Sequence, residues 1–196
     1  SAFAPESEWS NGWIAVSDTW TYASATTITV PSGAASKYQK GDKIKITNNS
    51  ATKYFYIVGV ADTVLTVTGG SDYTVHNSAI TNPYFSKIEN PQGFPHWFNW
   101  SPTFGGDGLT YTSVTGTTRF NICEGTVNVV IRVTGTVGGT ARAYVAITAP
   151  TTTGGGASEV GCFILDDATR IGYMQTIGSP NNVIYFYKLG GNVTAG

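Results

Sequence analysis

The chain has 196 residues and a net charge of −1; 12% of its side chains are charged, 13% are aromatic, and 24 residues are glycine. This charge balance excludes a global field that would attract nucleic acid or an anionic membrane. No apolar run approaches the roughly 18 residues of a transmembrane helix, and two cysteines are too few for a dense disulfide scaffold. β-Branched and aromatic residues dominate the apolar segments, and no segment holds an amphipathic helical face for three turns, so we predict an all-β protein.

The first part of the chain predicts a short extension and a small β domain. Residues 1–12 form the expected N-terminal extension, and S-A-F-A-P-E-S-E-W shows neither the basic region nor the apolar core of a signal peptide. Residues 13–92 predict a small antiparallel barrel or sandwich, because short β patterns alternate with turn residues. The expected strands are 13–16, 27–30, 43–47, 54–60 and 64–68.

Two of these strands carry most of the information about the small domain. Ile44 and Ile46 are expected to point inward, with Lys43 and Lys45 pointing outward. The segment 54–60 is apolar on both faces, which predicts a central strand.

The stretch from Lys37 to Lys53 is the basic cluster of the chain, with Asp42 as the single acid inside it. Such a cluster could contact phosphates, but stacking aromatics are not interleaved on the same face, so nucleic-acid binding is not expected. We favour lysines on an edge strand, where they block unwanted strand pairing.

Residues 93–102 predict a connector, because prolines interrupt the segment and proline cannot donate to a sheet ladder. Four large aromatic residues of this segment would be costly to leave in water and are expected to pack a domain junction or a subunit interface: Phe94, Trp97, Phe98 and Trp100. Truncating Trp97 to alanine would then cost about 3–5 kcal/mol.

Residues 103–196 predict a jelly-roll-like β-sandwich of seven strands. The expected strands are 110–115, 118–123, 126–133, 141–148, 160–165, 170–176 and 183–189, with glycine, Asp or Asn in the turns. The last expected strand is followed by a glycine turn. The sheet would be completed either by a neighbouring chain or by further residues of a longer protein, and the sequence leaves both open.

The search for catalytic and metal-binding groups is mostly negative. Asp166 and Asp167 are adjacent, but consecutive residues of a turn diverge, so a hairpin turn explains them better than a glycosidase pair. His76 and His96 lack neighbouring Cys or His at metal spacing, and no zincin, P-loop or nucleophile-elbow motif occurs. We therefore expect no enzyme, no metal site and no cofactor.

Aromatic side chains offer the most plausible binding chemistry, because sugars stack on Trp or Tyr rings while polar groups satisfy their hydroxyls. The turn from Leu165 to Arg170 combines two carboxylates, a hydroxyl and a guanidinium, and loops are where recognition residues concentrate. The candidate ligand-binding residues are Asp166, Asp167, Arg170 and Tyr173, and the alternative is that the strand tyrosines Tyr111, Tyr173, Tyr185 and Tyr187 fill a core or an interface.

Three motifs carry a resemblance to a known class of proteins. W-S-P-T-F begins at Trp100, and F-N-I-C-E-G-T-V-N-V runs from Phe120 to Val129. The third motif is Y-Q-K-G-D-K-I-K-I-T from Tyr38, followed by Y-F-Y-I-V. The first two, followed by a strand that ends at Pro150, resemble the C-terminal domains of bacteriophage tail-fibre and related virion appendage proteins. The third is similar to N-terminal modules of phage tail-associated proteins.

The resemblance implies a non-enzymatic virion structural protein, in a tail fibre, tip or head fibre, that presents a β-sandwich for host attachment. It further implies a homotrimer, contacts with other virion proteins and possible binding to a host cell-surface glycan. A weakly charged, Thr-rich exterior independently suggests burial against sister subunits. The alternatives are a bacterial surface carbohydrate-binding module or adhesin, extracellular rather than virion-bound, and a glycan-degrading tailspike.

Overall fold

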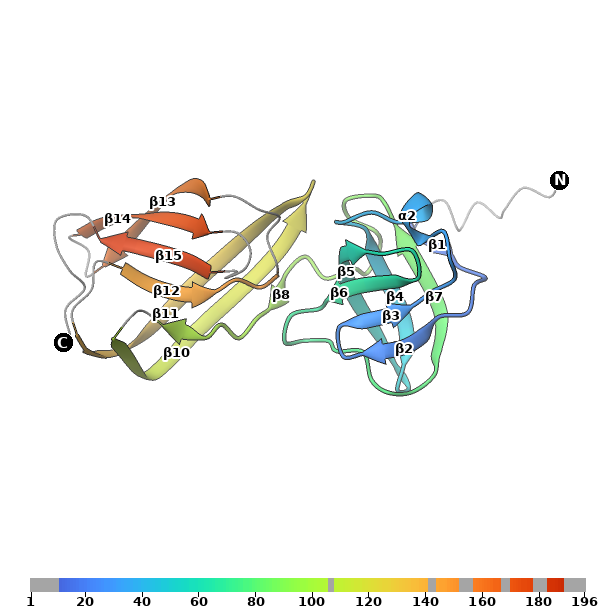
Figure 1. Ribbon diagram of the computed structural model, residues 1–196, viewed down its shortest axis with the longest axis horizontal. Helices are drawn as coiled ribbons and strands as arrows, with labels where there is room; N and C mark the ends of the chain where they lie inside the picture. The colour runs from blue at the N-terminus through green and yellow to red at the C-terminus, as the bar shows by residue number, and fades with distance from the viewer. Residues whose placement is uncertain are drawn as a thin grey trace. The chain divides into compact units, whose positions relative to one another are not determined.

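The computed structural model describes residues 11–105, 108–140, 144–151, 157–166, 170–177 and 183–188 (Figure 1). For residues 157–166, 170–177, 187 and 188 it describes the backbone alone. The strands pair antiparallel in three sheets, which confirms the predicted all-β class.

The chain folds into two compact units, each with most of its residue contacts within itself. Unit 1 comprises Ser1–Trp100 together with Arg119–Val129, and unit 2 comprises Ser101–Thr118 together with Val130–Gly196. Trp100 lies within the expected connector. The assignment of residues 119–129 to unit 1 has no counterpart in the sequence-based division.

Unit 1 contains a seven-stranded sheet in the order β1-β7-β4-β5-β6-β3-β2. A one-turn helix, α2 (Ala34–Lys37), follows β3. The strands are β1 (Ile14–Ala15), β2 (Thr21–Ser24), β3 (Thr27–Thr29), β4 (Lys43–Asn48), β5 (Ala51–Val60), β6 (Val64–Thr68) and β7 (Ile80–Ser86).

The hydrophobic core of unit 1 lies on one face of this sheet. Strands β3 to β7 all contribute residues to this core. Figure 1 shows that the sheet curls around it. Its most deeply buried members are Ile28, Ile44, Ile46, Phe55, Ile57 and Leu65. The inward direction predicted for Ile44 and Ile46 is confirmed, and β5 is the middle strand of the sheet, as predicted from its apolar residues on both faces.

The prediction that the lysines of the basic cluster from Lys37 to Lys53 lie on an edge strand is wrong for Lys43 and Lys45. Strand β4 is paired on both sides, with β7 and with β5. Lys43 is buried and Lys45 is half-buried. Their side chains therefore do not protect a sheet edge, and their actual contacts are described with the candidate site.

Asn48, at the end of β4, forms hydrogen bonds that link the loop before β7, which contains His76 and Ser78, to the sheet. Its side chain is buried, and its Oδ1 accepts hydrogen bonds from the backbone N–H of His76 at 2.7 Å and from Lys53 Nζ at 3.2 Å. Its Nδ2 lies 3.0 Å from Ser78 Oγ and 3.1 Å from the carbonyl oxygen of His76. The following turn residues, Asn49 and Ser50, have φ angles of 54° and 60°, as a two-residue hairpin of the primed type requires.

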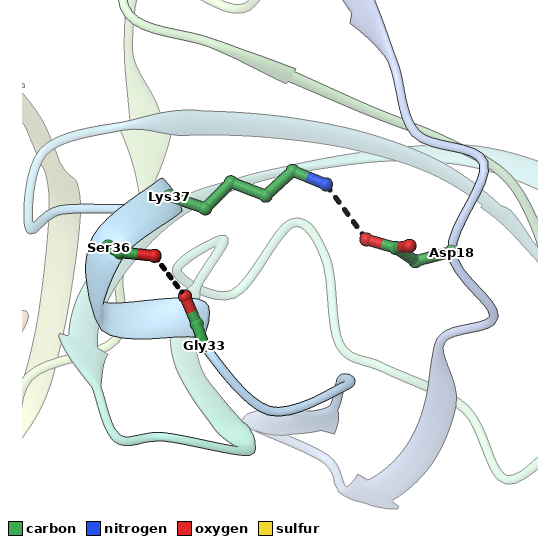
Figure 2. A network of polar contacts seen from close by, with 4 residues as sticks. All are labelled: Asp18, Gly33, Ser36 and Lys37. Atoms are coloured by element: carbon green, nitrogen blue, oxygen red, sulfur yellow. Dashed lines mark hydrogen bonds and ion pairs between the residues drawn. The ribbon is translucent and has the colours of Figure 1, made fainter.

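Lys37 of α2 forms a surface ion pair with Asp18, which lies between β1 and β2 (Figure 2). Its Nζ is 2.8 Å from Asp18 Oδ2, and this hydrogen bond raises the pKa of Lys37. In the same view the Ser36 hydroxyl donates to the carbonyl of Gly33 at 2.8 Å. Both side chains of the ion pair are more than a third exposed, so its contribution to stability is small.

The remaining strands form two further sheets. The three-stranded sheet has the order β11-β10-β8, with β8 (Phe98–Asn99), β10 (Leu109–Cys123) and β11 (Thr126–Gly139). The five-stranded sheet has the order β13-β14-β15-β12-β9, with β9 (Phe104–Gly105), β12 (Tyr144–Thr148), β13 (Ala157–Asp166), β14 (Arg170–Ile177) and β15 (Val183–Lys188).

Strand β10 corrects one sequence prediction. The sequence predicts separate strands at residues 110–115 and 118–123 with a turn at Gly116, but these residues form one continuous strand. A Cβ at Gly116 would lie 2.0 Å from the carbonyl oxygen of Arg132 on β11. Glycine is therefore needed there for the close approach of two strands and not for a turn.

Candidate functional site

The turn expected to bind ligands lies largely outside the described residues. Asp167 is one of the residues not described, and of Asp166, Arg170 and Tyr173 only the backbone is described. In the backbone register Asp166 pairs with Arg170 at the end of the β13–β14 hairpin, and Tyr173 pairs with Tyr187 of β15. Asp166 and Arg170 therefore flank the turn on neighbouring strands.

A second group of aromatic side chains lies on the face of the unit 1 sheet opposite its core. We call Trp13, Tyr54, Tyr56, Phe94, Phe98 and Phe120 the aromatic layer. Phe98 is at its centre, with ring centroids 5.3 Å from Tyr56, 5.5 Å from Phe94 and 5.9 Å from Phe120. Tyr54 and Tyr56 reach this face because they alternate along β5 with the core residues Phe55 and Ile57.

The layer explains where the aromatic residues of the connector lie. Phe94, Phe98 and Trp100 are buried. The indole N–H of Trp13 donates to the carbonyl of Gln92, the residue just before the connector, at 2.8 Å. Trp97 differs from the other three, because it is 36% exposed. The burial of Trp97 therefore does not support a loss of about 3–5 kcal/mol on its truncation to alanine. We expect a loss of that size at Phe98, which is fully buried.

The tip of the β10–β11 hairpin completes the aromatic layer. Phe120 is fully buried and Ile122 is 5% exposed, and β10 pairs with β8 through Phe120 and Phe98. Burial raises the pKa of Tyr56, and a hydrogen bond from the backbone of Ile122 opposes that rise. Phe120 and Ile122, near the tip of the hairpin, are therefore part of the interior of unit 1.

The two lysines of β4 lie against aromatic rings and not in open solvent. Lys43 Nζ is 5.9 Å from the Tyr56 ring centre and 3.6 Å from a carboxylate oxygen of Glu89. Lys45 Nζ is 4.3 Å from the ring centre of Tyr84 and 4.8 Å from that of Trp13, and burial lowers its pKa. Both ammonium groups thus exchange part of their hydration for ring faces.

Asp42, beside this layer, is a carboxylate almost removed from water. It is 2% exposed, its Oδ2 accepts from the backbone N–H of Gln39 at 3.0 Å, and Lys87 Nζ lies 3.6 Å away. Burial raises the pKa of Asp42 above its ordinary value of 3.8, and the Gln39 hydrogen bond and the Lys87 charge only partly oppose this. The group is held by the turn that precedes β4, and its ionised form is penalised in the folded state.

This geometry predicts a pH-dependent effect of Asp42→Asn. Because the native pKa is raised, the native state binds the proton more tightly, and the contribution of Asp42 to stability rises as the pH falls through that pKa, in the range above 3.8. At pH 7 the Asn variant, which keeps an acceptor for Gln39, should be as stable as the wild type or more stable, and this difference should narrow toward pH 4. Urea unfolding at both pH values measures it, with Asp62→Asn, an exposed acceptor for the Gly33 N–H, as the matched control. A variant that is less stable than the wild type at pH 7 by more than about 1 kcal/mol would mean that the Lys87 ion pair outweighs the cost of burial.

The described tyrosines of the expected sugar-binding set have partners within the protein. Tyr111 is half-buried, its ring centre is 5.8 Å from that of Phe104, and its hydroxyl donates to the carbonyl of Gly105 at 3.1 Å. Tyr185 is half-buried with its ring centre 5.0 Å from that of Tyr144. These two rings therefore contribute to packing, and Tyr173 and Tyr187 have no described side chains.

No group of three or more His, Cys, Asp or Glu side chains suited to a metal ion occurs within the described ranges. His76 and His96 are both exposed, and Cys123 carries a free thiol. Among the described residues, no helix is long and apolar enough to cross a membrane.

Comparisons with protein-family models, with curated proteins and with solved structures find no match for this chain.

The sequence did not predict two groups of contacts that organise unit 1, namely the hydrogen bonds of Asn48 and the contact between Phe98 and Phe120. The alternation of Tyr54 and Tyr56 with Phe55 and Ile57 was the available signal that both faces of β5 are covered.

Proposed function

We propose that this chain is a non-enzymatic structural protein of a bacteriophage virion, in a tail fibre, tip or head fibre, that serves attachment to the host surface. The observation that carries the proposal is the structural place of the motif from Phe120 to Val129. This segment bears the resemblance to virion appendage proteins, and it forms the hairpin tip whose Phe120 is buried in the aromatic layer. The motif therefore has a defined architectural role in the protein.

The chemistry of the described polar groups supports the same proposal. The ammonium groups of Lys43 and Lys45 lie against rings, the carboxylate of Asp42 accepts from a backbone N–H, and Lys53 donates to the carbonyl oxygen of Thr74 at 2.7 Å. These groups bind to rings and backbone of unit 1 itself, as a structural role requires.

Attachment would take place at the turns of unit 2, and the β13–β14 turn is the first candidate because Asp166 and Arg170 flank it. The partners would be other virion proteins, sister copies of the chain and a glycan or protein of the host surface. The homotrimer that the resemblance implies stays a prediction; the function requires more than one copy, because weak single sites become effective together.

A cell-retention assay tests this proposal. The labelled 196-residue chain is incubated with a panel of bacterial strains and with immobilised glycans, and both retained protein and released sugar are measured. We expect retention without sugar release, and a loss of at least tenfold in the double variant Asp167→Ala, Arg170→Ala. The matched control is Asp18→Ala, Lys37→Ala, which removes an exposed pair of the same charges from unit 1.

The other outcomes separate the alternatives. Undiminished retention in the Asp167, Arg170 variant would remove this turn as the binding site. Sugar release would indicate a glycan-degrading tailspike, and retention by a chain that is monomeric would indicate a carbohydrate-binding module or adhesin.

A further inference from the structure

Strand β11 offers an unusually complete edge for pairing with another strand. It spans 14 residues and lies at the end of its sheet, with β10 as its one strand neighbour in the described part of the chain. Its segment from Thr126 to Thr134 contains no proline, no glycine and a single charge, Arg132. Exposed edges are usually blocked by prolines, by charged residues or by bulges, so an edge with a single charge and no proline is suited to pairing.

The register of the β10–β11 hairpin identifies the backbone groups on this edge. Asn128 Nδ2 is 3.0 Å from Asn121 Oδ1, and the hydroxyls of Thr115 and Thr134 are 3.2 Å apart. Both contacts fit the register of a two-residue turn at Glu124 and Gly125, whose φ angles of 48° and 78° are both positive.

In that register the hydrogen-bonded pairs alternate with non-hydrogen-bonded pairs, starting from the pair that flanks the turn. The even-numbered residues from Thr126 to Thr134 therefore direct their backbone groups toward β10. The backbone N–H and C=O groups of Val127, Val129, Ile131 and Val133 point away from β10, toward the open edge. Their side chains are half-buried.

The sequence of this edge reads nearly the same in both directions. From residue 126 it is T-V-N-V-V-I-R-V-T, with Val130 in the middle. Two antiparallel copies centred on Val130 would place Val127 opposite Val133 and Val129 opposite Ile131, so that every outward backbone group meets an outward group. Asn128 would face Arg132, whose guanidinium donates to an amide oxygen, and no like charges would be opposed.

We propose that β11 pairs antiparallel with β11 of a second copy of this chain, about a two-fold axis at Val130. Such a contact is isologous and closes into a dimer, since the same residues serve on both sides. The inference rests on the proposed function, because it names a surface through which sister copies meet, and it predicts a dimer in place of the homotrimer that the resemblance implies.

A cysteine placed on the axis tests the geometry directly. In a non-hydrogen-bonded antiparallel pair the two Cα atoms are about 4.5 Å apart, which lies within the range of disulfides. In a Cys123→Ser background, Val130→Cys should therefore form a covalent dimer on mild oxidation. Thr134→Cys in the same background is the control, because its expected neighbour is Thr126 of the other copy and not Thr134.

A charge placed on the axis tests the energetics. Val130→Glu would oppose two carboxylates across the contact, whereas within one chain it would face Arg119 across the hairpin and leave the hairpin intact. Light scattering should give twice 20.7 kDa for the wild type and for the isosteric control Val130→Gln, and 20.7 kDa for Val130→Glu. Circular dichroism shows whether each variant is folded. If Val130→Glu does not fold, the cross-linking of Val130→Cys still tests the contact.

The outcomes distinguish this inference from the proposed function. If the wild type is an oligomer but Val130→Cys gives no more cross-linked dimer than Thr134→Cys, the β11 contact is overturned. The proposed function is not affected by that result. A trimer whose mass is unchanged by Val130→Glu would do the same and would favour the stoichiometry implied by the resemblance. A monomeric wild type would overturn both the β11 contact and the proposed assembly into a virion.

Discussion

Phe98→Ala is expected to lower the free energy of unfolding by about 3–5 kcal/mol, the usual cost of removing a buried aromatic side chain. Phe98 is fully buried, and its ring contacts those of Tyr56, Tyr73, Phe94 and Phe120. Its loss would leave a cavity between the sheet and the hairpin tip. Urea unfolding, followed by tryptophan fluorescence and by circular dichroism, measures the effect.

Trp97→Ala is the matched control, because Trp97 is the neighbouring residue of the same segment and is 36% exposed. It should cost about 1 kcal/mol or less, in the range of surface substitutions. Equal losses in the two variants would mean that burial of Phe98 in the aromatic layer does not determine the cost.

Asn48→Ala should produce the second large effect, about 2–4 kcal/mol, because it removes a buried acceptor and a buried donor together. The backbone N–H of His76 and the ammonium of Lys53 would lose the Oδ1 acceptor, and the loop that contains Ser78 would lose its link to β4. Chemical unfolding measures the loss, and hydrogen exchange should show faster exchange at His76.

Asn99→Ala is the control for this prediction. Its Nδ2 also donates to a side chain, Asp72 Oδ1 at 2.9 Å, but the bond is exposed and its groups can bond to water instead. We expect a loss below about 1 kcal/mol. A loss at Asn48 no larger than that at Asn99 would mean that the buried network does not contribute as its geometry indicates.

The local patterns of unit 1 could be predicted from the sequence because they depend on neighbouring residues. The alternation around Ile44 and Ile46 identified their inward direction, and the apolar run 54–60 identified the middle strand. The positions of Lys43 and Lys45 could not be predicted in the same way. Their alternation with isoleucine is that of a solvent-exposed face, and only the tertiary structure brings Trp13, Tyr56 and Tyr84 against their ammonium groups.

Contacts between distant segments were the main omission. Phe98 and Phe120 are separated by the end of the connector, by β9 and by most of β10, and no local pattern relates them. Gly116 was interpreted as a turn residue, although its role is to admit the backbone of Arg132. The sequence correctly predicted the two strands that flank the candidate binding turn. The side chains that would determine the chemistry of this turn lie outside the described residues.

The mass of the wild-type chain in solution, measured by light scattering over a micromolar dilution series, tests the central claim most directly. A virion structural protein built from sister copies should give a multiple of 20.7 kDa, and the β11 contact predicts twice that mass. A single species of 20.7 kDa throughout the series would contradict the account and would favour a monomeric binding module.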